Sequence, residues 1–335
     1  MSARESLQKT PILWPIFGIV FLLLILAFLK PDFFSIRIQD GHLYGNLIDI
    51  FTQSSHVMLL AMGMTLVIAV GGVDLSVGSV MALAATTTMV LIEQAGVGLW
   101  LAIPVGLVAG TMIGAANGAL VVFAKLQPIV ATLVFMVAGR GIAQLASNSN
   151  VITVNNEAMK TWGNGHFLAI PISLWMVGLV FVVLYFLLRK TALGLLVEAV
   201  GDNERASQFC GIDSNRLRII VYAFCGMLAG MAGLMRAAST VVADPNTMGL
   251  MLELDAIFAV IIGGTALTGG RFMLGGSILG VILLQTLTTT LIALDMPPAW
   301  APAPKAVVIV AVCLMQSGAF RKEVFGLFRL RRAGL

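Results

Sequence analysis

The sequence is dominated by runs of about 20 mostly apolar residues, the length that an α-helix needs to cross a lipid bilayer. Of the 335 residues, 59% are hydrophobic and 11% are charged, whereas a typical globular chain has about 25% charged residues. The runs are interrupted by Gly and other small residues, without the alternation of a membrane β-strand. Because unpaired backbone groups are costly in lipid and a helix pairs them internally, these apolar runs predict helices. The expected fold class is an all-α integral membrane protein.

The apolar runs predict about ten transmembrane helices, some of them discontinuous, with eight as the alternative. The ten candidate segments are 11–29, 48–70, 77–94, 98–124, 127–147, 167–188, 217–237, 251–268, 274–293 and 303–319. Arg4 and Lys9 precede the first run, as in a signal peptide, but no small-residue cleavage site follows it. We therefore expect the first run to be retained as a span.

The distribution of basic residues predicts the orientation. With the N-terminus inside, 14 of the 20 Lys and Arg residues fall on the cytoplasmic side, five fall outside, and Arg140 lies within a span. This bias follows the positive-inside rule and favours an even number of spans with both termini cytoplasmic. The connections are mostly short, so residues 1–335 are expected to form a single transmembrane domain, with a longer cytoplasmic segment at 189–216.

A glycine-rich break with one carboxylate separates the second and third spans. The stretch GGVDLSVG places Gly71, Gly72, Asp74 and Ser76 between two apolar runs. Gly permits a tight reversal or a break within a helix, and Asp74 and Ser76 are placed to cap the next helix. A sugar ligand is the alternative role for Asp74. We favour the structural role of a break and helix cap.

Several polar residues fall within or at the ends of predicted spans, where each is expensive unless it is paired or faces water. A polar substrate path would draw on Thr65, Ser79, Asn117 and Gln144. Asn117 also suits a helix-packing role. For Arg140, we expect a structural ion pair with one of the carboxylates rather than contact with substrate.

Other functions lack their residue patterns. The stretch IIGGTALTGGRFMLGG, residues 261–276, lacks the Lys-Ser/Thr of a phosphate-binding P-loop, so we expect a packing reversal there and no nucleotide site. No catalytic motif is present, the three Cys and three His residues lack metal-ligand spacing, and no basic patch indicates nucleic acid. Two rival functions stay open: a secondary transporter or channel that binds an ion or proton at Asp74 or Glu253, and a membrane enzyme using Glu253 and Asp255.

The cytoplasmic segment 189–216 predicts two short helices. KTALGLLVEAV can form an amphipathic helix, and GDNERASQFCG can form a second one that is capped by Asp202 or Asn203 and ended by Gly211. Such a segment presents a shaped surface for another protein. A solvated loop with a helical turn is the alternative.

Four motifs in this order resemble the permeases of ribose-type monosaccharide ABC importers: GGVDLSVGSVMAL, GAANGALVVFAKLQPIVATLVFMVAGRG, EAVGDNERASQFCGID and ELDAIFAVIIGGTALTGGR. Within that family, IQDGHLYGNLIDIF at residues 38–51 is most similar to galactofuranose permeases. The resemblance covers nearly the whole chain.

The resemblance implies a subunit of a heteromeric importer in a bacterial inner membrane, working by alternating access. The implied partners are a cytoplasmic ATPase that holds ATP and Mg, a second permease chain that is a paralogue, a periplasmic sugar-binding protein and the sugar itself. No cofactor is implied on this chain. The residues implied to couple to the ATPase are Glu198, Asn203, Glu204, Arg205, Ser207 and Gly211. Gly201 departs from the coupling motif of other importer permeases.

Overall fold

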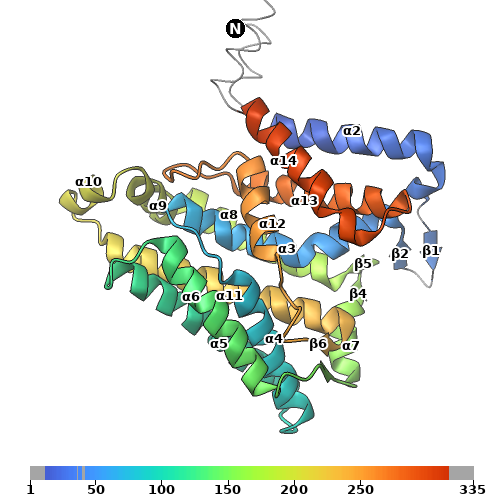
Figure 1. Ribbon diagram of the computed structural model, residues 1–335, viewed down its shortest axis with the longest axis horizontal. Coiled ribbons are helices and arrows are strands. Elements are labelled where there is room, and N and C mark those ends of the chain that lie inside the picture. Colours follow the sequence, from blue (N-terminus) through green and yellow to red (C-terminus); the bar gives the residue numbers. More distant parts are fainter. Residues whose placement is uncertain (1–11, 36, 40–41, 317–335) are drawn as a thin grey trace, which may run out of the picture.

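The computed structural model describes residues 12–35, 37–39 and 42–316, and it is predominantly helical (Figure 1). Its α-helices are α2 (Leu13–Leu29), α3 (Asn46–Ala69), α4 (Val77–Glu93), α5 (Leu99–Val122), α6 (Pro128–Ala146), α7 (Glu157–Asn164), α8 (Ile172–Lys190), α9 (Ala192–Asp202), α10 (Glu204–Phe209), α11 (Ser214–Thr240), α12 (Leu252–Ile262), α13 (Leu274–Ala293) and α14 (Pro302–Gln316). Short 3-10 helices occupy Pro31–Phe34 and Pro298–Trp300.

Each of the ten predicted spans coincides with one of these helices, which confirms the helical membrane class. Six helices in the described part of the chain are long and apolar enough to cross a bilayer, namely α3, α5, α6, α8, α11 and α13. The ten-span count stays a prediction. The two termini lie outside the described residues, so their cytoplasmic side stays a prediction as well.

The span expected at 251–268 is shorter than predicted. Helix α12 has 11 residues and ends at Ile262, which gives it a length of about 16 Å, roughly half the hydrocarbon thickness. The helix stops because Gly263 and Gly264 follow it, and Gly264 takes a φ of 92°. Gly263 also packs directly on Gly276 of α13. The reversal predicted for this glycine-rich stretch is therefore present.

Helices α3 and α11 form the centre of the bundle. In the most apolar window of α3, 78% of the residues are buried, against 22% in α5, α6 and α8. Helix α11 packs along α5, α3 and α4, while α13 packs on α3, α12 and α2. The apolar outer faces of α5, α6 and α8 are thus left for lipid or another chain.

Glycines bring α5 and α11 into close contact. A Cβ atom added to Gly110 would lie 2.8 Å from the Gly226 carbonyl oxygen, and one added to Gly114 would lie 2.3 Å from the Tyr222 carbonyl oxygen. In lipid, such small residues let helix backbones approach and gain packing energy. We call this contact the α5–α11 glycine seam.

Within the described residues, six short strands form three two-stranded antiparallel sheets, which the all-α prediction did not include. The pairs are β1 (Arg37–Gln39) with β2 (His42–Tyr44), β3 (Ile152–Thr153) with β6 (Val242–Ala243), and β4 (His166–Phe167) with β5 (Ile170–Pro171). All of them lie in connections between helices. They pair the backbone groups of those connections without adding a sheet to the bundle.

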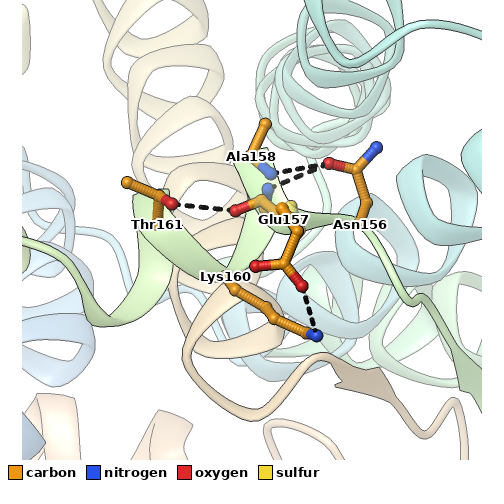
Figure 2. A network of polar contacts seen from close by, with 6 residues as sticks. Asn156, Glu157, Ala158, Lys160 and Thr161 are labelled. Atoms are coloured by element: carbon orange, nitrogen blue, oxygen red, sulfur yellow. Dashed lines mark hydrogen bonds and ion pairs between the residues drawn. The ribbon is translucent and has the colours of Figure 1, made fainter.

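The connection between α6 and α8 contains helix α7, which the apolar runs do not predict. Figure 2 shows why the helix starts there: the Asn156 side-chain oxygen accepts hydrogen bonds from the backbone N–H groups of Ala158 and Met159. Lys160 pairs with Glu157 at 2.8 Å on the same helix (Figure 2). Gly163 then packs against the backbone at Ala238 of α11. This contact fixes the loop on the bundle.

The molecule has two distinct ends. Helices α9 and α10 lie at one end of the bundle, on the left of Figure 1, and we call residues 189–216 the elbow. Helix α7 and the three sheets lie towards the opposite end, on the right, which we call the loop end.

Candidate functional site

The chain breaks between α3 and α4, where Asp74 and Ser76 are buried. We call residues 70–76 the first break, because α3 ends at Ala69 and α4 begins at Val77. Gly71 takes a φ of 77°, which other residues rarely adopt. The Asp74 side-chain oxygen Oδ1 accepts hydrogen bonds from the backbone N–H and the hydroxyl of Ser76, at 2.9 and 2.6 Å. Gly72 packs against the Tyr222 hydroxyl.

Side chains from three neighbouring helices form hydrogen bonds with polar groups of the first break. Asn117 of α5 donates from Nδ2 to the Ser76 hydroxyl at 2.7 Å. Thr132 of α6 and Tyr222 of α11 both donate to the Val73 carbonyl oxygen, at 3.4 and 3.5 Å. Backbone groups without a helix partner are tolerated at membrane depth only when protein or water satisfies them. The first break is therefore a specifically supported element.

The predicted capping role of Ser76 is wrong. Ser76 occupies the position before α4, but its side chain accepts no hydrogen bond from the first turn of that helix. Its hydroxyl donates to Asp74 and accepts from Asn117, so it is already used within the first break. Asp74 stabilises the turn that leads into α4 by holding the Ser76 N–H.

A second non-helical segment, residues 244–251, leads into α12, and sequence reasoning missed it. We call it the second break. The Arg140 guanidinium of α6 donates to the carbonyl oxygens of Pro245, Asn246 and Met248, each at 3.0 Å. Among the described residues, no carboxylate lies within ion-pair distance of Arg140, so the predicted ion pair is wrong. The three free carbonyl oxygens of a non-helical backbone take its place.

The two breaks meet near the starts of α4 and α12. A Cβ atom added to Gly78 would lie 2.3 Å from the Gly249 carbonyl oxygen, and one added to Gly249 would lie 2.2 Å from the Gly78 carbonyl oxygen. The Glu253 side chain also lies against Gly78. Two helix N-termini, each with a partial positive charge, therefore begin side by side at the buried Gly78.

Two carboxylate oxygens near this meeting point have no hydrogen-bond partner in the described part of the chain. They are Oδ2 of Asp74 and Oε2 of Glu253. Asp255, two residues further along the same helix, pairs instead with Lys305 of α14 at 2.8 Å. Discontinuous helices with polar groups at their starts are typical of substrate paths in transporters. The meeting of the two breaks is therefore the candidate functional site.

A cavity of about 470 Å³ opens beside the second break. We call it the loop-end cavity. Its lining residues are His56, Met81, Val151, Arg236, Thr240, Val242, Asp244, Thr247, Met248, Gly249, Leu250 and Leu252. Gly249 belongs to both the cavity and the contact between the breaks, so the cavity reaches that contact. The turn-forming sequence DPNTMG between two apolar runs was the only sequence signal for this region.

The side chains predicted for a polar path do not line this cavity. Thr65 is fully buried and donates to Ser277 of α13, and Ser79 is fully buried and donates to backbone oxygens. Asn117 is buried against the first break. Gln144 donates to the Asn246 side chain at 2.9 Å and so helps Arg140 to hold the second break. Their roles in the structure are to join helices and support the breaks.

The elbow consists of the two predicted helices, α9 and α10. The Asn203 side chain accepts a hydrogen bond from the Ala206 N–H, as expected of a helix cap, and Gly211 follows α10 with a φ of 84°. Glu204 is ion-paired with Arg218 of α11 at 2.9 Å. Ser207 is only 5% exposed.

The outer surface of the elbow therefore lies elsewhere. Arg205 is exposed, Glu198 is partly buried, and the Phe209 side chain is 92% exposed at the tip of α10. An aromatic side chain so exposed on a helix end is a good anchor for another protein.

The elbow is joined tightly to the end of α3. A Cβ atom added to Gly201 of α9 would lie 1.8 Å from the Ala69 carbonyl oxygen and 2.6 Å from the Gly270 backbone nitrogen. The Gly270 N–H in turn donates to the same Ala69 oxygen at 3.0 Å. The backbone immediately after Ala69 is the first break. The elbow thus contacts the chain where the first break begins.

These features define a class of protein: a helical membrane protein with a non-helical break between helices of its bundle and a helical elbow at one end. Residues 46–313 match the protein family described as "Branched-chain amino acid transport system / permease component". The chain belongs to this permease family, and its subunit type is a transport component rather than an enzyme.

Several curated relatives are similar over nearly their full length. The galactofuranose transporter permease protein YtfT of Escherichia coli (strain K12) is 41% identical, over 93% of both chains. The fructose import permease protein FruF of Bifidobacterium longum is 39% identical, over 93% of this chain and 89% of the relative. The ribose import permease protein RbsC of Haemophilus influenzae is 37% identical, over 89% of this chain and 90% of the relative.

Proposed function

We propose that this chain is a permease subunit of an ATP-driven importer for galactofuranose or a related monosaccharide in a bacterial inner membrane. The observation that carries the proposal is the 41% identity to a galactofuranose permease over 93% of both chains. Fructose and ribose permeases are similar over almost as much of the chain. A monosaccharide is therefore the substrate class that these relatives share.

In the proposed topology the whole chain is one transmembrane domain with ten spans, and both termini and the elbow lie in the cytoplasm. The loop end then faces outwards. Transport would follow alternating access at the interface with a second, paralogous permease chain. The broken helices α4 and α12 support this mechanism, because non-helical segments in a bundle can change their packing without unfolding whole spans.

The proposed partners divide the work of import. A periplasmic binding protein delivers the sugar at the loop end, and a cytoplasmic ATPase, which holds ATP and Mg, docks on the elbow. Movement of the elbow would reach the first break through the contact of Gly201 with Ala69. The exposed Arg205 and Phe209 are the proposed ATPase contacts. Glu204 and Ser207 are now assigned to holding the elbow in shape.

Co-purification with the ATPase tests the role of the elbow. The variant Phe209→Ala should weaken ATPase binding roughly thirtyfold, as expected for loss of an aromatic anchor worth about 2 kcal/mol. The matched control is Phe123→Ala, which removes a ring that is 74% exposed at the end of α5 and outside the elbow. Equal retention of the ATPase by both variants would contradict the proposed docking surface.

A proton- or ion-coupled transporter is the second candidate, because Asp74 and Glu253 each leave one buried oxygen without a partner. The energy source distinguishes the two functions. Inhibition of sugar uptake by vanadate supports the ATPase-driven importer. Loss of uptake on collapse of the proton gradient, with ATP still present, supports the coupled transporter.

A further inference from the structure

The loop-end cavity combines a suitable size with a mixed lining. Its volume of about 470 Å³ lies within the range of roughly 300 to 1,000 Å³ that is usual for small-molecule sites. Its walls come from α3, α4, α11, β6, the start of α12, the second break and Val151. Met81, Met248 and Leu252 supply apolar surface, while polar side chains project from the other walls.

Arg236 faces this cavity without a protein partner. Its side chain has no hydrogen bond or ion pair with any described residue, although it is exposed on α11. The three lysines towards the loop end are all ion-paired: Lys30 with Asp295, Lys160 with Glu157, and Lys305 with Asp255. The N–H donors of this exposed guanidinium are therefore available to a ligand in the cavity.

His56 of α3 lies close enough to Arg236 to feel its charge, and it too has no hydrogen bond within the described part of the chain. Arg236 of α11 and His56 of α3 thus both line the loop-end cavity, and no hydrogen bond joins their side chains. The Thr240 hydroxyl lies on the same wall, one helical turn after Arg236, and its hydrogen is shared between the Arg236 and Val242 carbonyl oxygens, so it can only accept from a ligand. Arg236 and His56 are therefore the side chains that can donate to a ligand in this part of the cavity.

The cavity also contains an acceptor of opposite charge. Burial alone would raise the pKa of Asp244, but hydrogen bonds from Thr247 and Asn246 outweigh it and lower the pKa overall. Its carboxylate is therefore ionised at neutral pH and offsets the charge of Arg236. One cation and one anion leave the lining neutral overall. This arrangement favours a neutral ligand with many hydroxyl groups over an anion, because each hydroxyl both donates and accepts hydrogen bonds.

We propose that the loop-end cavity is a transient binding site for a neutral monosaccharide, in which Arg236 and His56 are the main hydrogen-bonding side chains. The assignment of the ligand rests on the proposed function. The site would receive the sugar before it reaches the meeting point of the two breaks, which Gly249 shares with the cavity.

Uptake by the complete importer tests the site. The full-length chain would be reconstituted with its partner subunits in liposomes that contain ATP, and D-[14C]galactose would be supplied with the binding protein outside. Arg236→Gln should lower the initial uptake rate about tenfold, since a hydrogen bond to a charged group contributes roughly 1.5 kcal/mol or more. Lys160→Gln removes a cation near the same end but outside the cavity, and it should leave uptake unchanged.

Site occupancy gives a second measurement that does not depend on turnover. In a Thr240→Cys variant, a membrane-impermeant thiol reagent added outside should modify the new thiol, and galactose-loaded binding protein with trapped nucleotide should slow this modification. If the wild-type complex takes up galactose and Arg236→Gln and His56→Leu take it up equally fast, the proposed binding site is wrong, while the proposed function stands. Absence of galactose uptake by the wild-type complex would overturn the proposed function and, with it, this assignment of the ligand.

Discussion

At the scale of single residues, the polar side chains around the two breaks support non-helical backbone. Asp74, Ser76 and Asn117 form one hydrogen-bonded chain at the first break, and Arg140 holds the second break through three carbonyl oxygens. The sequence alone indicates that each of these polar side chains has a free-energy cost in lipid unless it is paired. It does not indicate their partners, because Arg140 lies more than 100 positions before the carbonyl groups that it binds.

Replacement of Asp74 is expected to affect folding before selectivity. Asp74→Ala removes the acceptor of two hydrogen bonds in the first break and leaves the buried Ser76 N–H unpaired, at a cost of about 1 to 3 kcal/mol. Asp74→Asn keeps an acceptor oxygen and should lose less. The measurement is the yield and thermal unfolding midpoint of the protein in detergent. A stable Asp74→Ala protein with altered sugar preference would contradict the structural role.

Replacement of Arg140 should loosen the second break alone. Arg140→Gln cannot span the carbonyl oxygens of Pro245, Asn246 and Met248, so residues 244–251 should exchange their amide hydrogens faster. Residues 70–76 serve as the internal control, because other side chains hold the first break. Hydrogen–deuterium exchange with mass spectrometry measures both segments. Unchanged exchange at 244–251 would show that Arg140 is not what orders them.

At the scale of helices, the sequence predicts well where the apolar helices lie, but it predicts poorly where α12 ends and does not predict α7. All ten apolar runs coincide with helices, because an apolar run in lipid has little choice but to satisfy its backbone internally. The early end of α12 and the presence of α7 were missed. Both depend on contacts between distant segments, such as Gly263 on Gly276 and Gly163 on Ala238.

The α5–α11 glycine seam should be intolerant of even one methyl group. Gly114→Ala would bring a Cβ atom within 2.3 Å of the Tyr222 carbonyl oxygen, so one helix must shift. We expect a loss of about 1 to 3 kcal/mol in stability. Gly141→Ala is the matched control, because Gly141 of α6 has open space at its Cβ position and Ala favours helix. Thermal unfolding in detergent compares them, and equal midpoints would exclude a tight seam.

At the scale of the whole molecule, three features lie along one route. The loop-end cavity reaches the meeting point of the two breaks, and the first break begins where the elbow contacts Ala69. The proposed docking surface at one end is thereby connected to a ligand-sized cavity towards the other through segments that are not helical. Apolar periodicity predicted the helices and the elbow, but the route depends on backbone contacts made by Gly78, Gly201 and Gly249.

Sugar uptake into proteoliposomes tests the central claim most directly. The chain, its partner permease and the ATPase would be reconstituted with ATP inside, and sugar-loaded binding protein would be added outside in the presence of a proton ionophore. The account predicts uptake that requires ATP and all partners, persists without a proton gradient and stops with vanadate. Uptake by this chain alone, or uptake abolished by the ionophore while ATP is present, would contradict it.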